Sequence, residues 1–118
     1  GLRQKIASDV SDFELSRDGN AIAALDNGGM NIIHPHDNSL YSFLAIPNTK
    51  AIAGLLWHQD SNHIFLLYPD HINFLDLNDA TIANNLEFAK GSEFAYLPQS
   101  AMVYALNGTV LTKFQFPQ

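Results

Sequence analysis

Turn-forming pairs that recur at a regular spacing are the feature that most constrains the fold of this chain. One set lies between apolar runs at intervals of 42 and 39 residues: Asp18-Gly19, Asp60-Ser61 and Gln99-Ser100. A second set recurs at 43 and 37 residues: Asn27-Gly28, Asp70-His71 and Asn107-Gly108. The third set is 41 residues apart: Asp37-Asn38 and Asn78-Asp79. Gly and Asn tolerate positive φ and so favour tight turns. The spacing predicts a structural unit that repeats about every 40 residues.

The segments between these turns indicate β-strands. They are rich in Ile, Leu, Phe, Val and Tyr, and their length of roughly 6–9 residues is usual for strands. Residues 64–68 are continuously apolar, which is typical of a strand buried on both faces. Residues 50–57 show no helical periodicity and contain Gly54, so we assign them to a strand as well. Four short strands per repeat are typical of a β-propeller blade, whereas the alternative is a β-sandwich whose turns align by chance.

We therefore predict an all-β protein: a β-propeller arc of about three four-stranded antiparallel blades. The expected blades span residues 8–46, 50–86 and 92–118, with residues 2–7 as a leading outer strand. If strands are labelled a to d from the propeller axis outward, the chain starts with a d strand and ends after a third a-b-c. Pairing the two ends would close a ring and cover an exposed sheet edge.

Three blades are fewer than the roughly four to eight of closed propellers. We favour a fragment of a longer or split propeller, because the blades are unequal and Gly1 is not a natural start. The alternative is a homodimer that forms a six-bladed ring, in which each copy donates its d strand to the other.

Residues 16–33 (SRDGNAIAALDNGGMNII) resemble a blade of the WD-repeat family. In that family a Ser-Pro-Asp-Gly-like turn, a small-apolar strand, an Asp-Gly-like turn and a Val-x-Ile strand follow in this order. Residues 57–77 match more loosely, and residues 96–114 keep only the turns and the strand rhythm. The chain has no Gly-His dipeptide, and its only Trp is not part of a Trp-Asp pair. The resemblance implies a scaffold of multiprotein assemblies, with Asp26 or Asp70 supporting a b–c turn by hydrogen bonds.

Composition argues against several classes of function. The net charge of −6 disfavours a nucleic-acid surface, which needs clustered Lys and Arg. The chain has no Cys, and thus no disulfide, thiolate nucleophile or cysteine metal site. The apolar stretches fall short of the ~20 residues that span a bilayer, and the first residues lack the apolar core of a signal peptide. We expect an intracellular protein with no membrane or nucleic-acid partner.

Motifs for catalysis are missing from the sequence. There is no Gly-x-Ser-x-Gly elbow, phosphate loop or dinucleotide fingerprint, so we expect no enzyme activity and no cofactor. His34-Pro35-His36-Asp37 groups two imidazoles with a carboxylate, but this spacing matches no established metal motif. We interpret it as a polar turn. His58 and His63 flank the second a–b turn and could face each other across it, although turn histidines are usually solvated. No metal site is assigned.

Trp57 ends an a strand beside a loop, where an exposed aromatic side chain could anchor a partner. It could equally pack between blades. We predict Trp57, His58, His36 and Asp37 as binding residues of a non-catalytic protein–protein interaction scaffold, and the acidic balance favours a partner with a basic patch. The alternative is an oligomeric propeller that binds a small ligand or carbohydrate. The aligned positions Leu15 and Tyr96 do not repeat Trp57, which counts against that alternative.

Overall fold

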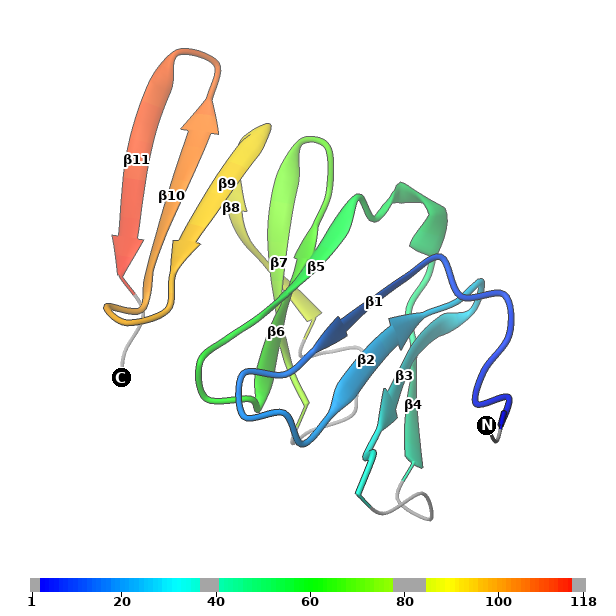
Figure 1. Cartoon of the computed structure of the whole chain (residues 1–118). Helices are drawn as coiled ribbons and strands as arrows, with labels where there is room; N and C mark the ends of the chain where they lie inside the picture. The colour runs from blue at the N-terminus through cyan, green and yellow to red at the C-terminus, as the bar shows by residue number, and fades with distance from the viewer. Residues whose placement is uncertain (1–2, 37–40, 78–84, 116–118) are drawn as a thin grey trace.

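The described part of the chain folds into eleven strands in three antiparallel sheets. A computed structural model describes residues 3–36, 41–77 and 85–115 (Figure 1). Sheet 1 contains β1 (Asp12–Leu15), β2 (Ile22–Leu25), β3 (Gly29–Ile33) and β4 (Tyr41–Ala45) in that order. Sheet 2 contains β5 (Gly54–Trp57), β6 (His63–Leu67), β7 (His71–Asp76) and β8 (Asn85–Lys90). Sheet 3 contains β9 (Glu93–Leu97), β10 (Met102–Asn107) and β11 (Val110–Gln115).

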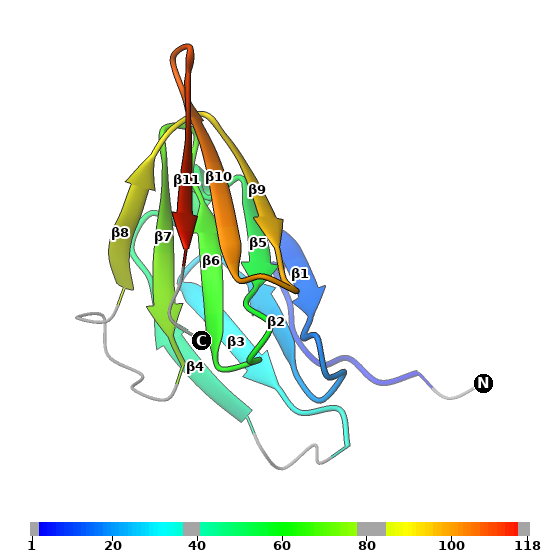
Figure 2. The ribbon, with the colours of Figure 1, turned by 90° about the vertical axis from the view of Figure 1, so that its left-hand side faces the viewer.

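Each sheet pairs its strands in chain order, as expected where turns of a few residues join antiparallel strands. The sheets lie one behind another, with sheet 2 in the middle (Figures 1 and 2). Two apolar clusters fill the spaces between them. The first joins sheets 1 and 2 through residues such as Leu25, Met30 and Leu66. The second joins sheets 2 and 3 through residues such as Phe65, Ile72 and Val103. Sheet 2 is therefore apolar on both faces, which explains the unbroken apolar run of β6.

The predicted β-propeller arc is confirmed: the three sheets, of four, four and three strands, match about a third of a propeller chain. Two boundaries differ from the prediction. The outer strand of blade 2, expected to end at residue 86, continues to Lys90. Its pairing with β7 is interrupted by a β-bulge between Ile72 and Asn73. Residues 50–53 are not in a strand. Asn48 adopts φ 55°, and a 3₁₀ turn (η1, Thr49–Ala51) precedes β5.

Residues 3–7 form no strand here. An outer d strand needs a c strand beside it. Among the described strands, β11 is the c strand that has no outer neighbour, and it lies at the far end of the arc. The predicted pairing of residues 2–7 with such a strand stays a prediction. The ranges that the structure describes contain no helix long and apolar enough to cross a membrane.

Candidate functional site

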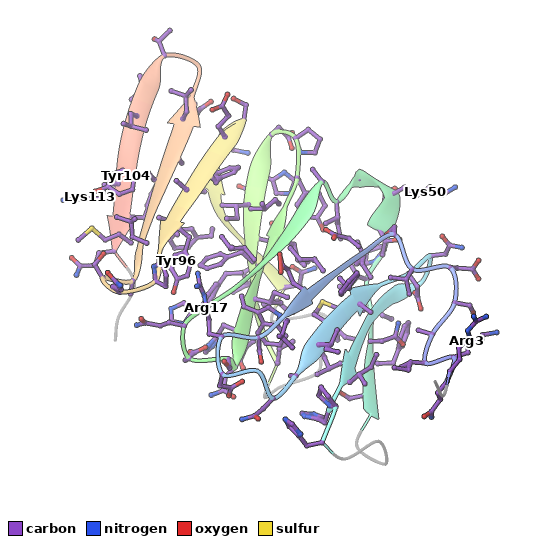
Figure 3. All side chains as sticks on the ribbon, viewed as in Figure 1. Arg3, Arg17, Lys50, Tyr96, Tyr104 and Lys113 are labelled. Carbon is purple, nitrogen blue, oxygen red and sulfur yellow. The ribbon has the colours of Figure 1, made fainter. Side chains whose placement is uncertain are left out.

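The first turn of each blade lies at the same end of the arc. The β1–β2 turn (residues 16–21) and the β5–β6 turn (residues 58–63) lie close together, since Ala21 from the first and Ser61 and Asn62 from the second line the same hollow. A hydrogen bond links the β5–β6 turn to the third blade: the Gln59 N–H donates to Oη of Tyr96, in β9, at 3.0 Å. Arg17 and Tyr96, from different blades, point toward one another (Figure 3). We call these two turns and the end of β9 the turn face.

Aspartates hold the first two of these turns in shape. Asp18 accepts hydrogen bonds from the Asn20 N–H (2.9 Å) and the Ser16 hydroxyl (2.7 Å), and these lower its pKa. Asp60 accepts from the N–H groups of Asn62 (2.9 Å) and His63 (3.1 Å). Burial raises the pKa of Asp60, but the hydrogen bonds from Asn62 and His63 and the nearby imidazoles outweigh it and lower the pKa overall. Both carboxylates therefore act as fixed acceptors inside their own turns.

The b–c turns test the role implied for Asp26 and Asp70. Asp26 accepts from the N–H groups of Gly28 (2.8 Å) and Gly29 (3.0 Å) and from the Asn31 amide (2.9 Å), which confirms the expectation for this residue. Asp70 differs, because its carboxylate lies 2.6 Å from Nδ1 of His71. That side-chain contact is the largest of the effects that lower the pKa of Asp70.

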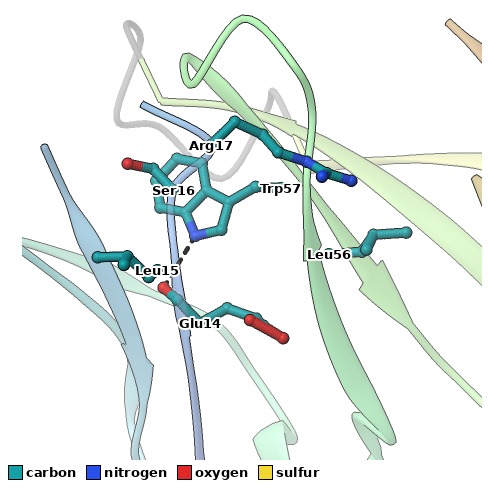
Figure 4. A pocket seen from close by; sticks show the side chains of 6 residues that line it. All are labelled: Glu14, Leu15, Ser16, Arg17, Leu56 and Trp57. Carbon is teal, nitrogen blue, oxygen red and sulfur yellow. Dashed lines mark hydrogen bonds between the residues drawn. The ribbon is translucent and has the colours of Figure 1, made fainter. Parts of the chain in front are cut away.

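Trp57 is an inter-blade core residue. Its side chain lies in the apolar cluster between sheets 1 and 2, and the residue is 2% exposed. The indole N–H donates to the carbonyl oxygen of Glu14 at 2.9 Å and ties β5 to β1 (Figure 4). The prediction of Trp57 as an exposed anchor is therefore wrong for this chain: the a strand that it ends is covered by the neighbouring blade.

A hollow of about 380 Å³ lies beside this contact, on the side of the a strands. It is lined by Glu14, Leu15, Ser16, Arg17, Leu56 and Trp57 (Figure 4). Glu14 and Arg17 give it one group of each charge. Of the predicted binding residues Trp57 and His58, Trp57 lines this hollow and His58 does not.

His58 and His63 face the same carboxylate across the β5–β6 turn. Nδ1 of His58 lies 3.1 Å from Oδ1 of Asp60, and Nδ1 of His63 lies 2.6 Å from Oδ2. The two rings are 5.9 Å apart. His58 is 5% exposed, so the expectation of a merely solvated turn histidine is wrong for this residue. The spacing His-x-Asp-x-x-His around a turn was the sequence signal for this cluster.

The other predicted binding residues lie elsewhere. His36 is exposed beyond the end of β3, at the same end of blade 1 as the turn face but on the outer side of the blade. Asp37 lies outside the described residues. The structure therefore does not join His36 to Trp57 and His58 in one site.

The two end faces of the arc form a second candidate surface. On the outer face of sheet 1, Phe13 pairs with Ala24 and Leu15 pairs with Ile22. Phe13 is 66% exposed, although residues 3–10 run along part of this face. On the outer face of sheet 3, Leu106 pairs with Leu111, which is also 66% exposed. The sequence signal for these faces was the presence of apolar residues, such as Phe13, Leu15 and Leu111, at positions that alternate with those entering the core.

A groove of about 360 Å³ lies on the outer strands of blade 2. Its walls are the aromatic rings of Phe74 and Phe88, and its polar groups include Asp76, Glu87 and His63. The groove therefore begins at the His58–Asp60–His63 turn and is acidic.

Comparison with known proteins supports the fold alone. No family model matches the chain, and no curated protein does. The structure is similar to Hsv2 of Kluyvelomyces marxianus, with a TM-score of 0.56 and 12% identity over 94% of this chain and 34% of that one. It is also similar to a functionally unknown protein from Desulfotomaculum acetoxidans DSM 771, with a TM-score of 0.53 and 13% identity over 90% of this chain and 39% of that one. The chain thus spans little more than a third of the length of these proteins.

Proposed function

We propose that this chain is part of a WD-repeat-type β-propeller that acts as a non-catalytic protein–protein interaction scaffold in a multiprotein assembly. The observation that supports this most directly is the pair of end faces. Large apolar side chains stay exposed on both of them: Phe13 and Leu15 on sheet 1, and Leu97 and Leu111 on sheet 3. Exposed apolar side chains that gather on one face are typical of an interaction site.

The partner that fits an end face is another β-sheet of blade type, from a second copy or from a chain that completes the propeller. Sheet-on-sheet packing would bury Phe13, Leu15 and Leu111 as their counterparts are buried inside the arc. The turn face would then be free to recognise further proteins, because the hydrogen bonds of Asp18 and Asp60 fix its backbone while exposed side chains can vary.

The test is the native mass together with the denatured mass of the same preparation. We expect a native mass of at least twice the 13.0 kDa of the chain, or a second chain in the sample. Leu111→Lys should weaken association at least about tenfold, because burying one Leu is worth roughly 1.5–3 kcal/mol.

Val110→Lys is the matched control. Val110 is 62% exposed on the same strand, but the alternation of β11 places it on the opposite face from Leu111. This variant should associate as the wild type does. A stable wild-type monomer with no partner chain, or equal loss in both variants, would contradict the proposal.

A second candidate is a propeller that binds a small ligand or carbohydrate. The groove of Phe74, Phe88, Asp76 and Glu87 favours it, since aromatic walls with a few carboxylates suit such ligands and its size lies in the range of ligand pockets. Binding of a mono- or oligosaccharide that Phe88→Ala removes would support this function over the scaffold, whereas Phe13→Ala is a control on a distant surface.

A further inference from the structure

We propose that His58, Asp60 and His63 bind a divalent transition-metal ion, with Zn²⁺ as the best-suited ion. The inference goes beyond the scaffold function and does not depend on it. One ligand atom from each of the three residues lies within 4.8 Å of the other two. Zinc bonds to His nitrogen and carboxylate oxygen measure about 2.0–2.2 Å, so tetrahedral ligand atoms are roughly 3.4 Å apart. The ligand atoms of the three residues are separated by 2.6 Å at the shortest and by no more than 4.8 Å. These distances lie on both sides of the tetrahedral value, so each ligand atom would need to move by less than about 1.5 Å to bind the ion.

The His58 ring is held so that a lone pair faces the turn. Its Nδ1 accepts the Asp60 N–H at 3.2 Å, a long contact that a metal ion could replace. The rings of Phe65, Phe74 and Tyr96 lie around it, with centroids between 5.7 and 6.2 Å away. Because these rings come from β6, β7 and β9, the position of this ligand is set by the packing of two blades.

The His63 ring is fixed by a stacked aromatic ring and a second carboxylate. It stacks on Phe74 at 4.7 Å with an angle of 7° between the rings. Its Nδ1 faces Asp60, while Nε2 lies 3.7 Å from Oδ1 of Asp76. A ligating histidine commonly has its other nitrogen near a carboxylate, which orients the ring. Asp76 is placed to act in this way.

The donor set selects the class of metal. Two imidazoles and one carboxylate suit Zn²⁺ and other late transition metals, whereas Ca²⁺ and Mg²⁺ prefer six or more oxygen ligands. Three protein ligands leave one position of a tetrahedron for water or an incoming group. The groove that begins at His63 provides access from solvent.

The experiment is titration of the chain, in the assembly that it forms, with ZnCl₂ by calorimetry and with CoCl₂ by visible absorption. We expect one ion per chain and the intense absorption bands of tetrahedral Co²⁺. His63→Gln and His58→Gln should each weaken binding at least about tenfold. His63 decides the outcome, because its side chain is 25% exposed and its loss should leave the fold intact, which circular dichroism checks.

His71→Gln is the matched control. His71 forms a pair with Asp70 at the same Nδ1–oxygen distance of 2.6 Å, but no third ligand joins them in the described ranges. This variant should bind Zn²⁺ like the wild type. The proposal is overturned if the wild type shows no saturable binding, or if His63→Gln binds as tightly as the wild type. It is also overturned if His71→Gln loses as much affinity as His63→Gln, which would indicate non-specific binding to His–Asp pairs.

Discussion

Single residues in the turns carry much of the local order of this protein. Asp26 shows how, because one of its oxygens accepts the Gly28 N–H in the β2–β3 turn and the other accepts the Asn31 amide of β3. The Asn31 amide, followed by the Gly28 N–H, holds the pKa of Asp26 below its usual value. A carboxylate with a lowered folded-state pKa stabilises the fold above its unfolded-state pKa, and this contribution is lost as the pH falls through the folded-state value.

The first prediction concerns Asp26→Asn. The variant should be less stable than the wild type at pH 7, because a neutral amide accepts hydrogen bonds from N–H groups more weakly than a carboxylate does. The difference should shrink as the pH falls below about 4, where Asp26 of the unfolded chain becomes protonated, and should be lost once the pH is below the lowered pKa of the folded chain. Urea unfolding followed by circular dichroism at a series of pH values measures it. A difference that does not change with pH would contradict the assigned role.

The second prediction concerns Trp57→Phe. Removing the indole N–H leaves the Glu14 carbonyl without this donor and loosens the contact between β5 and β1, at a cost of about 1–3 kcal/mol. The free energy of unfolding should be measured by circular dichroism, since Trp57 is the only Trp in the chain. Glu14→Ala is the control: the acceptor is the backbone oxygen, so this variant should lose much less stability.

At the scale of the elements, the pairing of β3 with β4 depends on one of two adjacent glycines. A Cβ on Gly29 would collide with the carbonyl oxygen of Leu44 and come within 3.0 Å of the backbone of Ala45 and Ile46. A Cβ on Gly28 would meet its nearest atoms, from Phe43 and Asp26, at 3.7 and 3.8 Å, which is ordinary contact. The close approach of two strands therefore requires Gly at position 29 alone.

The third prediction follows from this contrast. Gly29→Ala should lower the free energy of unfolding by about 1–3 kcal/mol, because the start of β3 must move away from β4. Gly28→Ala should change it by less than about 1 kcal/mol. Thermal or urea unfolding of both variants tests the pair. Equal effects would mean that the loss of backbone freedom, rather than the collision, decides their stability.

At the scale of the whole molecule, the two end faces and the net charge of −6 act in opposite directions on association. Burial of Phe13 and Leu111 would favour it, whereas like charges on two copies repel. Salt screens the repulsion and leaves apolar burial intact.

The fourth prediction is therefore that association of the chain with itself strengthens as NaCl is raised from about 20 mM to about 500 mM, over which the Debye length falls well below 10 Å. Sedimentation at several salt concentrations measures it. Dissociation with rising salt would show that ion pairs, and not the apolar end faces, hold the copies together.

The blades and most strand boundaries could be predicted from the sequence because turn formation is local. Pairs such as Asn27-Gly28 and Asn107-Gly108 set where strands end, and alternation sets which side chains share a face. The later end of β8 and the 3₁₀ turn before β5 could not be predicted in this way, since they depend on pairing with β7 and on the αL conformation of Asn48.

The sequence by itself determined the repeat and the class of fold, because turns and strands form between neighbours within a few residues along the chain. The resemblance to a WD-repeat blade added the expectation that Asp26 or Asp70 supports a b–c turn. The tertiary structure alone decided that Trp57 is buried against Glu14 and that His58, Asp60 and His63 converge beside rings from two blades. It also decided which apolar rows remain exposed at the ends of the arc. The physical reason is the same in each case. Whether a side chain is core, ligand or surface depends on which sheet packs against it, and alternation along one strand carries no information about that neighbour.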